Sequence, residues 1–476
     1  MPAVMRAAAV VEKAGVPAVA IGASGFESMG RAVARWLGVS DVPIASYPGV
    51  ILTDSDEEFR RKVRETVAPA VRDGLVERSS GPAVAAEEPE PPARSVFLRG
   101  SLDDVQEDLL RRGLSDGLPV MPPTAERVER FLPFTDRLPD EVLGVLPPDL
   151  RPLSVWSVAA HGVMAGCRPE YMPVLVALGE CLADPRFRLE DAGSTPGWEP
   201  MAVLSGPIAD DLNFNSGTGV MRVGRQANTS VGRFVRMLMR NVAGLWIPPG
   251  NTDQGAVAST FNVVLAEDDA AVLATGWPEH RVDEGLGPDD DMVGLRSVVT
   301  ISAPIYSSGS RAEEHLRTIA DLFGRAIGPW AWTGVAFGAW HPLLVLGPSI
   351  AATISADGWT KDDVRRYLHE TVRGPAGWME KCAEDVGRTG FRFAGSVARG
   401  EAPFEYAQSD DPDRLVPMFV RPEWIGIVVA GSAARNQSRA YVNNHAQGAP
   451  VARRVHRPEG WRRLLDAERR RTGRPR

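Results

Sequence analysis

The stretch PAVAIGASGFESMGRAVARWLGVSDVPIASY, residues 17–47, determines the fold class of the first part of the chain. Its two apolar runs, 17–22 and 43–47, have the composition of short strands, and residues 25–37 between them have the periodicity of a helix. Strands that alternate with helices pair in parallel. The stretch therefore predicts a parallel α/β unit.

Helical patterns on both sides of this stretch, at residues 3–14 and 56–73, extend the unit to residues 1–77. The unit begins with a helix, whereas a parallel sheet normally begins with a strand. We therefore expect a sheet that lacks its first strand and has an exposed edge unless a partner covers it.

The remainder of the chain divides by composition. Residues 78–95 are rich in Pro, Glu, Ala and Ser and predict a disordered linker, residues 96–452 predict a larger α/β domain, and residues 453–476 form a basic tail with ten arginines. Within the larger domain, an apolar run followed by Gly and a helix start recurs at 202–214, 344–355 and, more loosely, 427–438. This repetition raises the hypothesis of an internal duplication, although βα turns commonly share the pattern.

Composition excludes several classes of protein. The chain has 476 residues, a net charge of -8, 44% hydrophobic residues and 24% charged ones, which is typical of a globular protein of two or three domains and not of a nucleic-acid binder. The uncharged segment 330–356 is long enough for a membrane span. Because His341-Pro342 and Gly347-Pro348 interrupt it, we predict a buried strand, turn and helix instead.

The cysteines and histidines give no metal or disulfide pattern. The three cysteines, Cys167, Cys181 and Cys382, are too few for a disulfide framework, and the seven histidines do not have the spacing of metal ligands. We expect no metal site, and the sequence assigns no cofactor. The N-terminus does not have the pattern of a signal peptide, so a reducing cytoplasm is the expected compartment.

The loop NFNSGTGVMRVGRQAN, residues 213–228, combines glycines, short polar side chains and two arginines directly before a helix. A helix N-terminus attracts anions, and glycines let a ligand approach the backbone. We therefore predict a site for a small anionic metabolite, formed by this loop and the similar junction after residue 347: Asn213, Asn215, Ser216, Arg222, Arg225, Asn228 and Ser349. The alternative is a turn-rich connection without a ligand.

The helix after this loop has one continuous apolar face if Thr229 is its N-cap. Arg233, Arg236 and Arg240 then lie together, nearly opposite that face. They are predicted to form a solvent-exposed stripe or a contact between subunits of a homo-oligomer.

The segment HGVMAGCRPEY, residues 161–171, contains the candidate reactive group. Pro169 and Glu170 are typical of the first turn of a helix, so Cys167 is predicted to lie beside a helix N-terminus, which stabilises a thiolate. His161 is a candidate base, and the predicted catalytic residues are Cys167, His161 and Glu170. The alternative is that Cys167 is a small buried hydrophobe.

Several segments together resemble the UGSC-like family, which is named for a selenocysteine–Gly–Ser–Cys or Cys–Gly–Ser–Cys motif. Residues 11–49 resemble its small α/β domain. A larger domain is often found with it, and the segments of this chain that resemble that domain are 115–132, 164–178, 206–219, 227–242 and 344–368. The resemblance implies thiol-redox chemistry. In the family the motif precedes the helix that begins this chain, so we expect either a start site placed too far downstream or a member that has lost this centre.

Three functions are consistent with the sequence. The first is a redox or thiol-dependent enzyme that acts on a small anionic metabolite. The second is a non-redox lyase or hydrolase that uses the Asn, Ser and Arg residues of the 213–228 loop, with an inert Cys167. The third is a non-catalytic subunit that binds a partner through the stripe of three arginines.

Overall fold

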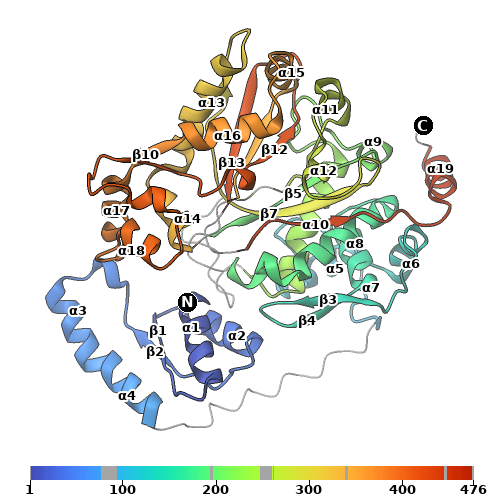
Figure 1. Ribbon diagram of the computed structural model, residues 1–476. Helices are drawn as coiled ribbons and strands as arrows, with labels where there is room; N and C mark the ends of the chain where they lie inside the picture. Colours follow the sequence, from blue (N-terminus) through green and yellow to red (C-terminus); the bar gives the residue numbers. More distant parts are fainter. Residues whose placement is uncertain are drawn as a thin grey trace.

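The computed structural model describes residues 2–76, 94–192, 197–246, 260, 262–337, 341–443 and 448–473. A small N-terminal unit and a larger domain each combine helices with strands, which confirms the predicted α/β class (Figure 1). All of the predicted linker except Arg94 and Ser95 lies outside the described residues.

The N-terminal unit has the predicted order of elements: α1 (Pro2–Lys13), β1 (Ala20–Ala23), α2 (Glu27–Trp36), β2 (Ile44–Tyr47), α3 (Asp56–Lys62) and α4 (Ala68–Val76). β1 and β2 pair in parallel, with Ala20 opposite Ile44. α1 and α2 cover one face of this pair and bury Met5 and Val33, while the π-helical turn between α3 and α4 buries Val67 on the other face.

The larger domain is built on one mixed sheet. Its strands follow the order β12 (Gly426–Val429), β9 (Leu343–Leu346), β13 (Gln437–Asn443), β7 (Met292–Ile301), β5 (Glu199–Ser205) and β6 (Leu265–Ala266), with β14 (Val451–Arg454) paired to β7 and β8 (Ile305–Tyr306) paired to β13. β5 is parallel to β6 and β9 is parallel to β12, whereas β7 and β13 are antiparallel to their neighbours. The Asp268 amide, just after β6, donates to the Val429 carbonyl of β12 at 2.9 Å, so the sheet curls until its edges meet.

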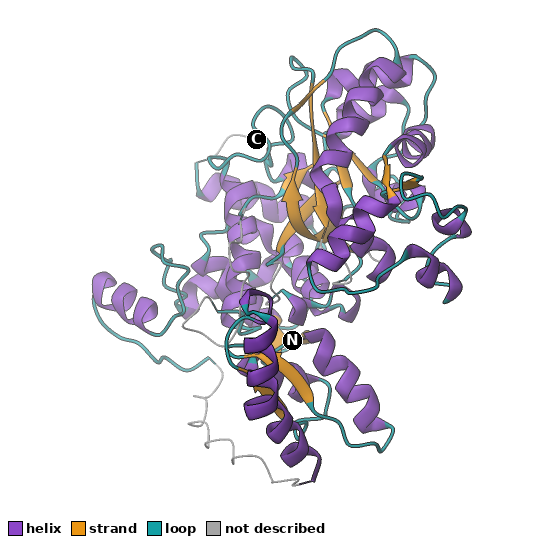
Figure 2. Ribbon diagram, turned by 90° about the vertical axis from the view of Figure 1, so that its left-hand side faces the viewer, coloured by secondary structure: helices purple, strands orange, loops and turns teal. Residues whose placement is uncertain are grey.

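Helices enclose the curled sheet (Figure 2). α7 (Val155–Met164), α8 (Met172–Ala183) and α10 (Gln226–Asn241) pack on β5 and β7, and α13 (Ala312–Ile327), α15 (Pro348–Ala356) and α16 (Lys361–Thr371) pack on β9, β12 and β13. The predicted strand–Gly–helix junctions are present at Gly206 and Gly347, but a turn follows Gly431.

The other helices and strands of the larger domain lie around this core. They are α5 (Leu102–Arg111), α6 (Ala125–Glu129), β3 (Val142–Leu146), β4 (Arg151–Ser154), α9 (Ile208–Asp211), α11 (Asp269–Thr275), α12 (His280–Asp283), α14 (Ala331–Phe337), β10 (Arg373–Pro375), α17 (Ala376–Asp385), α18 (Phe393–Ala398), β11 (Leu415–Pro417) and α19 (Trp461–Arg471).

The structure can be compared with the predictions for two further segments, the uncharged segment 330–356 and the basic tail. The uncharged segment 330–356 contains α14, β9 and α15, which confirms the buried strand followed by a turn and a helix. Within the described residues, no helix combines the length and the apolar character needed to cross a bilayer. The basic tail takes part in the fold, because α19 buries Trp461 and Leu465, and the Trp461 ring lies 6.2 Å from that of Phe134.

The arginines of α10 do not form the predicted solvent stripe, and the alternative of a subunit contact stays a prediction. The helix starts at Gln226, with Arg225 rather than Thr229 at its N-cap. All three arginines have partners within the larger domain: Arg233 pairs with Asp116 at 2.7 Å, Arg236 lies 3.6 Å from Glu199, and Arg240 donates to the Gly113 carbonyl at 2.7 Å. The prediction of a solvent stripe was wrong because the distant segment 113–119 covers the polar face of α10, which is therefore buried on both sides.

Candidate functional site

A cavity of about 490 Å³ lies where α6, α10, α19 and the turn between α7 and α8 meet. Four guanidinium groups, one carboxylate and one thiol line it: Arg127, Arg130, Arg168, Arg471, Glu468 and Cys167. Gln226, the first residue of α10, also lines the cavity. We call it the arginine cavity.

The charges around the arginine cavity are unbalanced. Glu468 pairs with Arg130 at 3.1 Å and with Arg471 at 2.7 Å, so one carboxylate serves two guanidinium groups. Arg127 donates to an uncharged partner, the Pro122 carbonyl, at 3.0 Å. The cavity therefore carries an excess of positive charge, which favours an anionic ligand.

Arg168 is oriented by the start of α10. Its Nε donates to Gln226 Oε1 at 2.6 Å, and Gln226 Nε2 donates to the Gly166 carbonyl at 3.2 Å. In the described part of the chain, no other side chain or carbonyl accepts from Arg168. Its two terminal nitrogens are therefore available to a ligand.

Cys167 lines the cavity and lies between the C-terminus of α7 and the 3₁₀ turn Pro169–Tyr171 that leads into α8. Gly166 has a φ of +80°, its amide donates to the Val163 carbonyl, and the Cys167 amide donates to the Gly162 carbonyl. This arrangement closes the C-terminus of α7, where the helix dipole disfavours a thiolate. The predicted helix start beside Cys167 is present at Pro169, but the predicted stabilisation of a thiolate was wrong because the thiol is buried and lies at the end of α7.

Burial raises the pKa of the Cys167 thiol to about 12, and a hydrogen bond with Ser230 and the charge of Arg233 offset this only in part. The thiol is therefore protonated at neutral pH. His161 Nδ1 donates to the Ser157 carbonyl at 2.8 Å, and burial lowers the pKa of this histidine. Neither His161 nor Glu170 lines the arginine cavity, so one of the three predicted catalytic residues reaches it.

The asparagine side chains of the 213–228 loop stabilise the conformation of the loop. Asn228 Nδ2 donates to the carbonyls of Asn215 and Val264, both at 2.9 Å, and its Oδ1 accepts from the Asn215 amide at 2.8 Å. Asn215 Oδ1 accepts from the Gly217 amide at 3.2 Å. The Ser216 carbonyl accepts from the Gly431 amide at 2.7 Å. These contacts favour the alternative of a turn-rich connection.

The other residues predicted to bind the anion lie apart from the arginine cavity. Arg222 and Arg225 are exposed, and Arg225 donates to Asn213 Oδ1 at 3.2 Å. Ser349 Oγ donates to the Arg435 carbonyl at 2.9 Å. The loop contributes to the cavity only through Gln226, the residue with which α10 begins.

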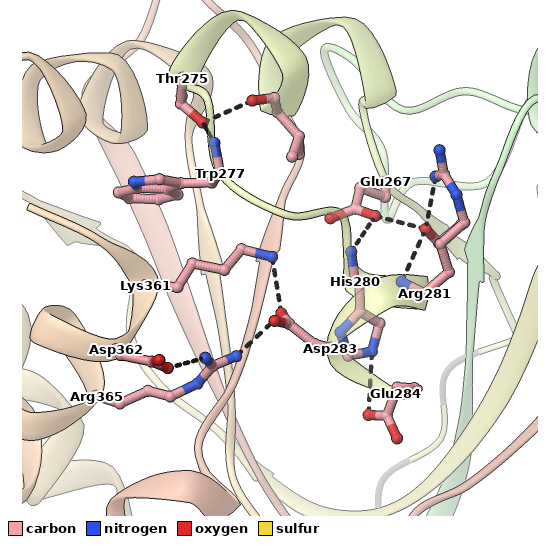
Figure 3. Close-up of polar contacts among 12 residues, drawn as sticks. Glu267, Thr275, Trp277, His280, Arg281, Asp283, Glu284, Lys361, Asp362 and Arg365 are labelled. Atoms are coloured by element: carbon pink, nitrogen blue, oxygen red, sulfur yellow. Dashed lines mark hydrogen bonds and ion pairs between the residues drawn. The ribbon is translucent and has the colours of Figure 1, made fainter. Parts of the chain in front are cut away.

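A second charged group of residues, which the sequence analysis missed, lies just beyond the ends of β5 and β6 (Figure 3). Glu267 Oε2 accepts from Ser205 Oγ at 2.6 Å and from the His280 amide at 2.8 Å. Glu267 Oε1 has no partner among the described residues. Burial raises the pKa of Glu267 to about 7, although the charge of Lys361 opposes this.

The remaining charges of this group are paired. Arg281 contacts Asp269 at 2.9 Å, and Asp283 accepts from Lys361 at 2.8 Å and from Arg365 at 3.0 Å. Burial and the charge of Arg296 hold the pKa of His280 well below its usual value. We call this group the Glu267 cluster: Ser205, Glu267, His280, Arg281, Asp283 and Lys361. Its only sequence signal is a carboxylate directly after the apolar run 263–266, at the carboxyl end of a strand.

The comparisons with known proteins concern the N-terminal unit. Residues 2–77 match the family model of the UGSC family, so this part of the chain is UGSC-like, as the sequence predicts. The matched segment contains no cysteine. No curated protein and no solved structure matches the chain.

Proposed function

We propose that the protein is an enzyme that binds a small anionic metabolite in the arginine cavity of its larger domain. The observation that supports this proposal most is that four guanidinium groups and a single carboxylate line a cavity of about 490 Å³. This volume lies in the range of small-molecule sites. A guanidinium binds a carboxylate or a phosphate through two parallel hydrogen bonds, which gives both affinity and orientation.

Arg168 is the main anion-binding residue in this proposal. Gln226 holds its Nε at 2.6 Å, so the side chain loses less conformational entropy when a ligand binds its terminal nitrogens. A bound anion is additional negative charge beside Cys167 and keeps the thiol protonated. The raised pKa of this thiol therefore supports an inert Cys167, which shapes the cavity wall and does not attack the substrate.

Isothermal titration calorimetry with inorganic phosphate at low ionic strength tests the proposal. We expect phosphate to bind the full chain, and Arg168→Gln to weaken binding by about tenfold or more because a charged hydrogen-bond donor is lost. The matched control is Arg222→Gln, which removes an exposed arginine of the 213–228 loop and leaves affinity unchanged. Equal affinity in Arg168→Gln and the unmodified protein contradicts the proposal, and a loss in Arg222→Gln instead moves the anion site to the loop.

A further inference from the structure

A second cavity, of about 610 Å³, lies next to the arginine cavity, between the segment 94–102, α5 and α7. Its lining is mainly apolar and includes Phe97, Leu98, Val105, Pro122, Trp156 and Ala160. We call it the apolar cavity.

Arg127 lines both cavities. Met121 lines the arginine cavity and the next residue, Pro122, lines the apolar cavity, so the two share a wall. The Arg127 guanidinium donates to the Pro122 carbonyl at 3.0 Å, which holds its charge at this wall. The charge of Arg127 therefore borders both cavities.

The apolar cavity presents hydrophobic side chains to water. Val96 is 66% exposed, Phe97 50% and Leu102 62%, although all three line one concave surface. Covering such a surface with an apolar group is favourable because it releases water from contact with hydrocarbon. An occupant that matches both neighbouring surfaces thus carries a negative charge beside an apolar chain or ring.

We propose that the ligand of the arginine cavity is an amphipathic carboxylate. Arg127 and Arg168 bind its carboxylate, and its apolar chain or ring fills the apolar cavity. This inference rests on the proposed function, because it assigns the substrate class of the same site. A fully polar anion occupies only the arginine cavity and leaves Phe97 and its neighbours in water.

Calorimetry on the full chain with acetate, octanoate and 1-octanol tests this assignment. Because each buried methylene adds favourable free energy, octanoate is expected to bind about tenfold or more tightly than acetate. Octanoate is also expected to bind more tightly than 1-octanol, which lacks the charge. Arg127→Gln is expected to weaken the binding of both octanoate and inorganic phosphate.

The Phe97→Ser variant tests the contribution of the apolar cavity separately from that of the arginine cavity. Because Phe97 is half exposed, this change does not disturb the hydrophobic core. It is expected to lower octanoate affinity about threefold or more while phosphate affinity is unchanged. The matched control is Phe404→Ser, at a side chain that is 71% exposed and lines neither cavity, and it alters neither affinity.

The outcomes distinguish the two proposals. Octanoate that binds no more tightly than acetate, or equally well in Phe97→Ser, overturns the amphipathic ligand and leaves the proposed function intact as long as phosphate binds. An octanoate affinity that is unchanged in Arg127→Gln also contradicts the amphipathic ligand, because the charge of Arg127 then plays no part in binding. Failure of phosphate, acetate and octanoate alike to bind contradicts the proposed function itself.

Discussion

The arginine cavity and the Glu267 cluster are both rich in charge, but they differ in balance and in access to water. In the arginine cavity, Arg130 and Arg471 are 41% and 51% exposed and share a single carboxylate. In the Glu267 cluster, Glu267 and Lys361 are 2% and 1% exposed, and the cations are paired with carboxylates. The first region is hydrated and unbalanced, whereas the second is sealed and balanced.

Because of this difference we propose a binding site for the first region and a structural role for the second. Hydrated guanidinium groups in excess gain favourable interactions when an anion arrives. Buried charges are tolerated only when they are paired, and such a cluster loses stability when one partner is removed. We therefore expect changes in the arginine cavity to alter ligand affinity, and changes in the Glu267 cluster to alter the free energy of unfolding.

A large effect on stability is expected from Lys361→Met. This change leaves Asp283 with Arg365 as its remaining cationic partner, so we expect the free energy of unfolding to fall by about 3 kcal/mol. The matched control is Lys381→Met, at a side chain 73% exposed that pairs with Asp385 on the surface, and its effect is below about 0.5 kcal/mol. Urea denaturation measures both, and similar values for the two variants contradict the structural role of the cluster.

Alkylation of Cys167 tests the chemistry of the arginine cavity. With a thiol pKa of about 12, the reactive thiolate is scarce, and we expect iodoacetamide to modify Cys167 about a hundredfold more slowly than free cysteine at pH 8. Peptide mass spectrometry over time measures the rate. A rate equal to that of free cysteine favours the thiol-dependent enzyme over the non-redox one.

Glu267→Gln is expected to change stability in a way that depends on pH. The folded-state pKa of about 7 lies above the ordinary carboxyl value, so the stability linked to Glu267 is fully present below about pH 4.3 and is lost as pH rises through 7. Glutamine copies the protonated form, so the variant is expected to match the unmodified protein at pH 4.5 and to be more stable than it by up to about 4 kcal/mol at pH 8.

Urea denaturation at the two pH values measures this difference, with Glu423→Gln, at a side chain 62% exposed, as the matched control. A Glu267→Gln variant that is less stable than the unmodified protein at pH 8 shows that the carboxylate is ionised and stabilising, which contradicts the account of the cluster.

Local sequence patterns predicted the elements of the N-terminal unit, because strand and helix periodicity there is set by neighbouring residues. The same reasoning misplaced the environment of Cys167. Pro169 gave a correct helix signal, but Gly166 closes the preceding helix first, and the thiol lies at that end. The arginines of α10 were wrongly assigned to solvent because the partners of Arg233 and Arg240 lie over a hundred residues away and that of Arg236 lies on a different element, β5.

The arginine cavity itself has no signature in the sequence. Arg127, Arg168, Gln226 and Glu468 come from four distant segments that meet only after the helices pack on the curled sheet. No spacing rule connects them, and of the 213–228 loop only Gln226, with which α10 begins, lines the cavity. The anionic ligand therefore stays a prediction of the sequence, and the cavity in which we propose that it binds could not be predicted from the sequence.

The most direct test of the central claim is a crystal structure of the full chain grown with selenate, located by its anomalous scattering. We predict an anomalous peak in the arginine cavity, within hydrogen-bonding distance of the terminal nitrogens of Arg168. A peak at the 213–228 loop with none in the cavity, or no bound selenate at concentrations that saturate phosphate binding in solution, contradicts it.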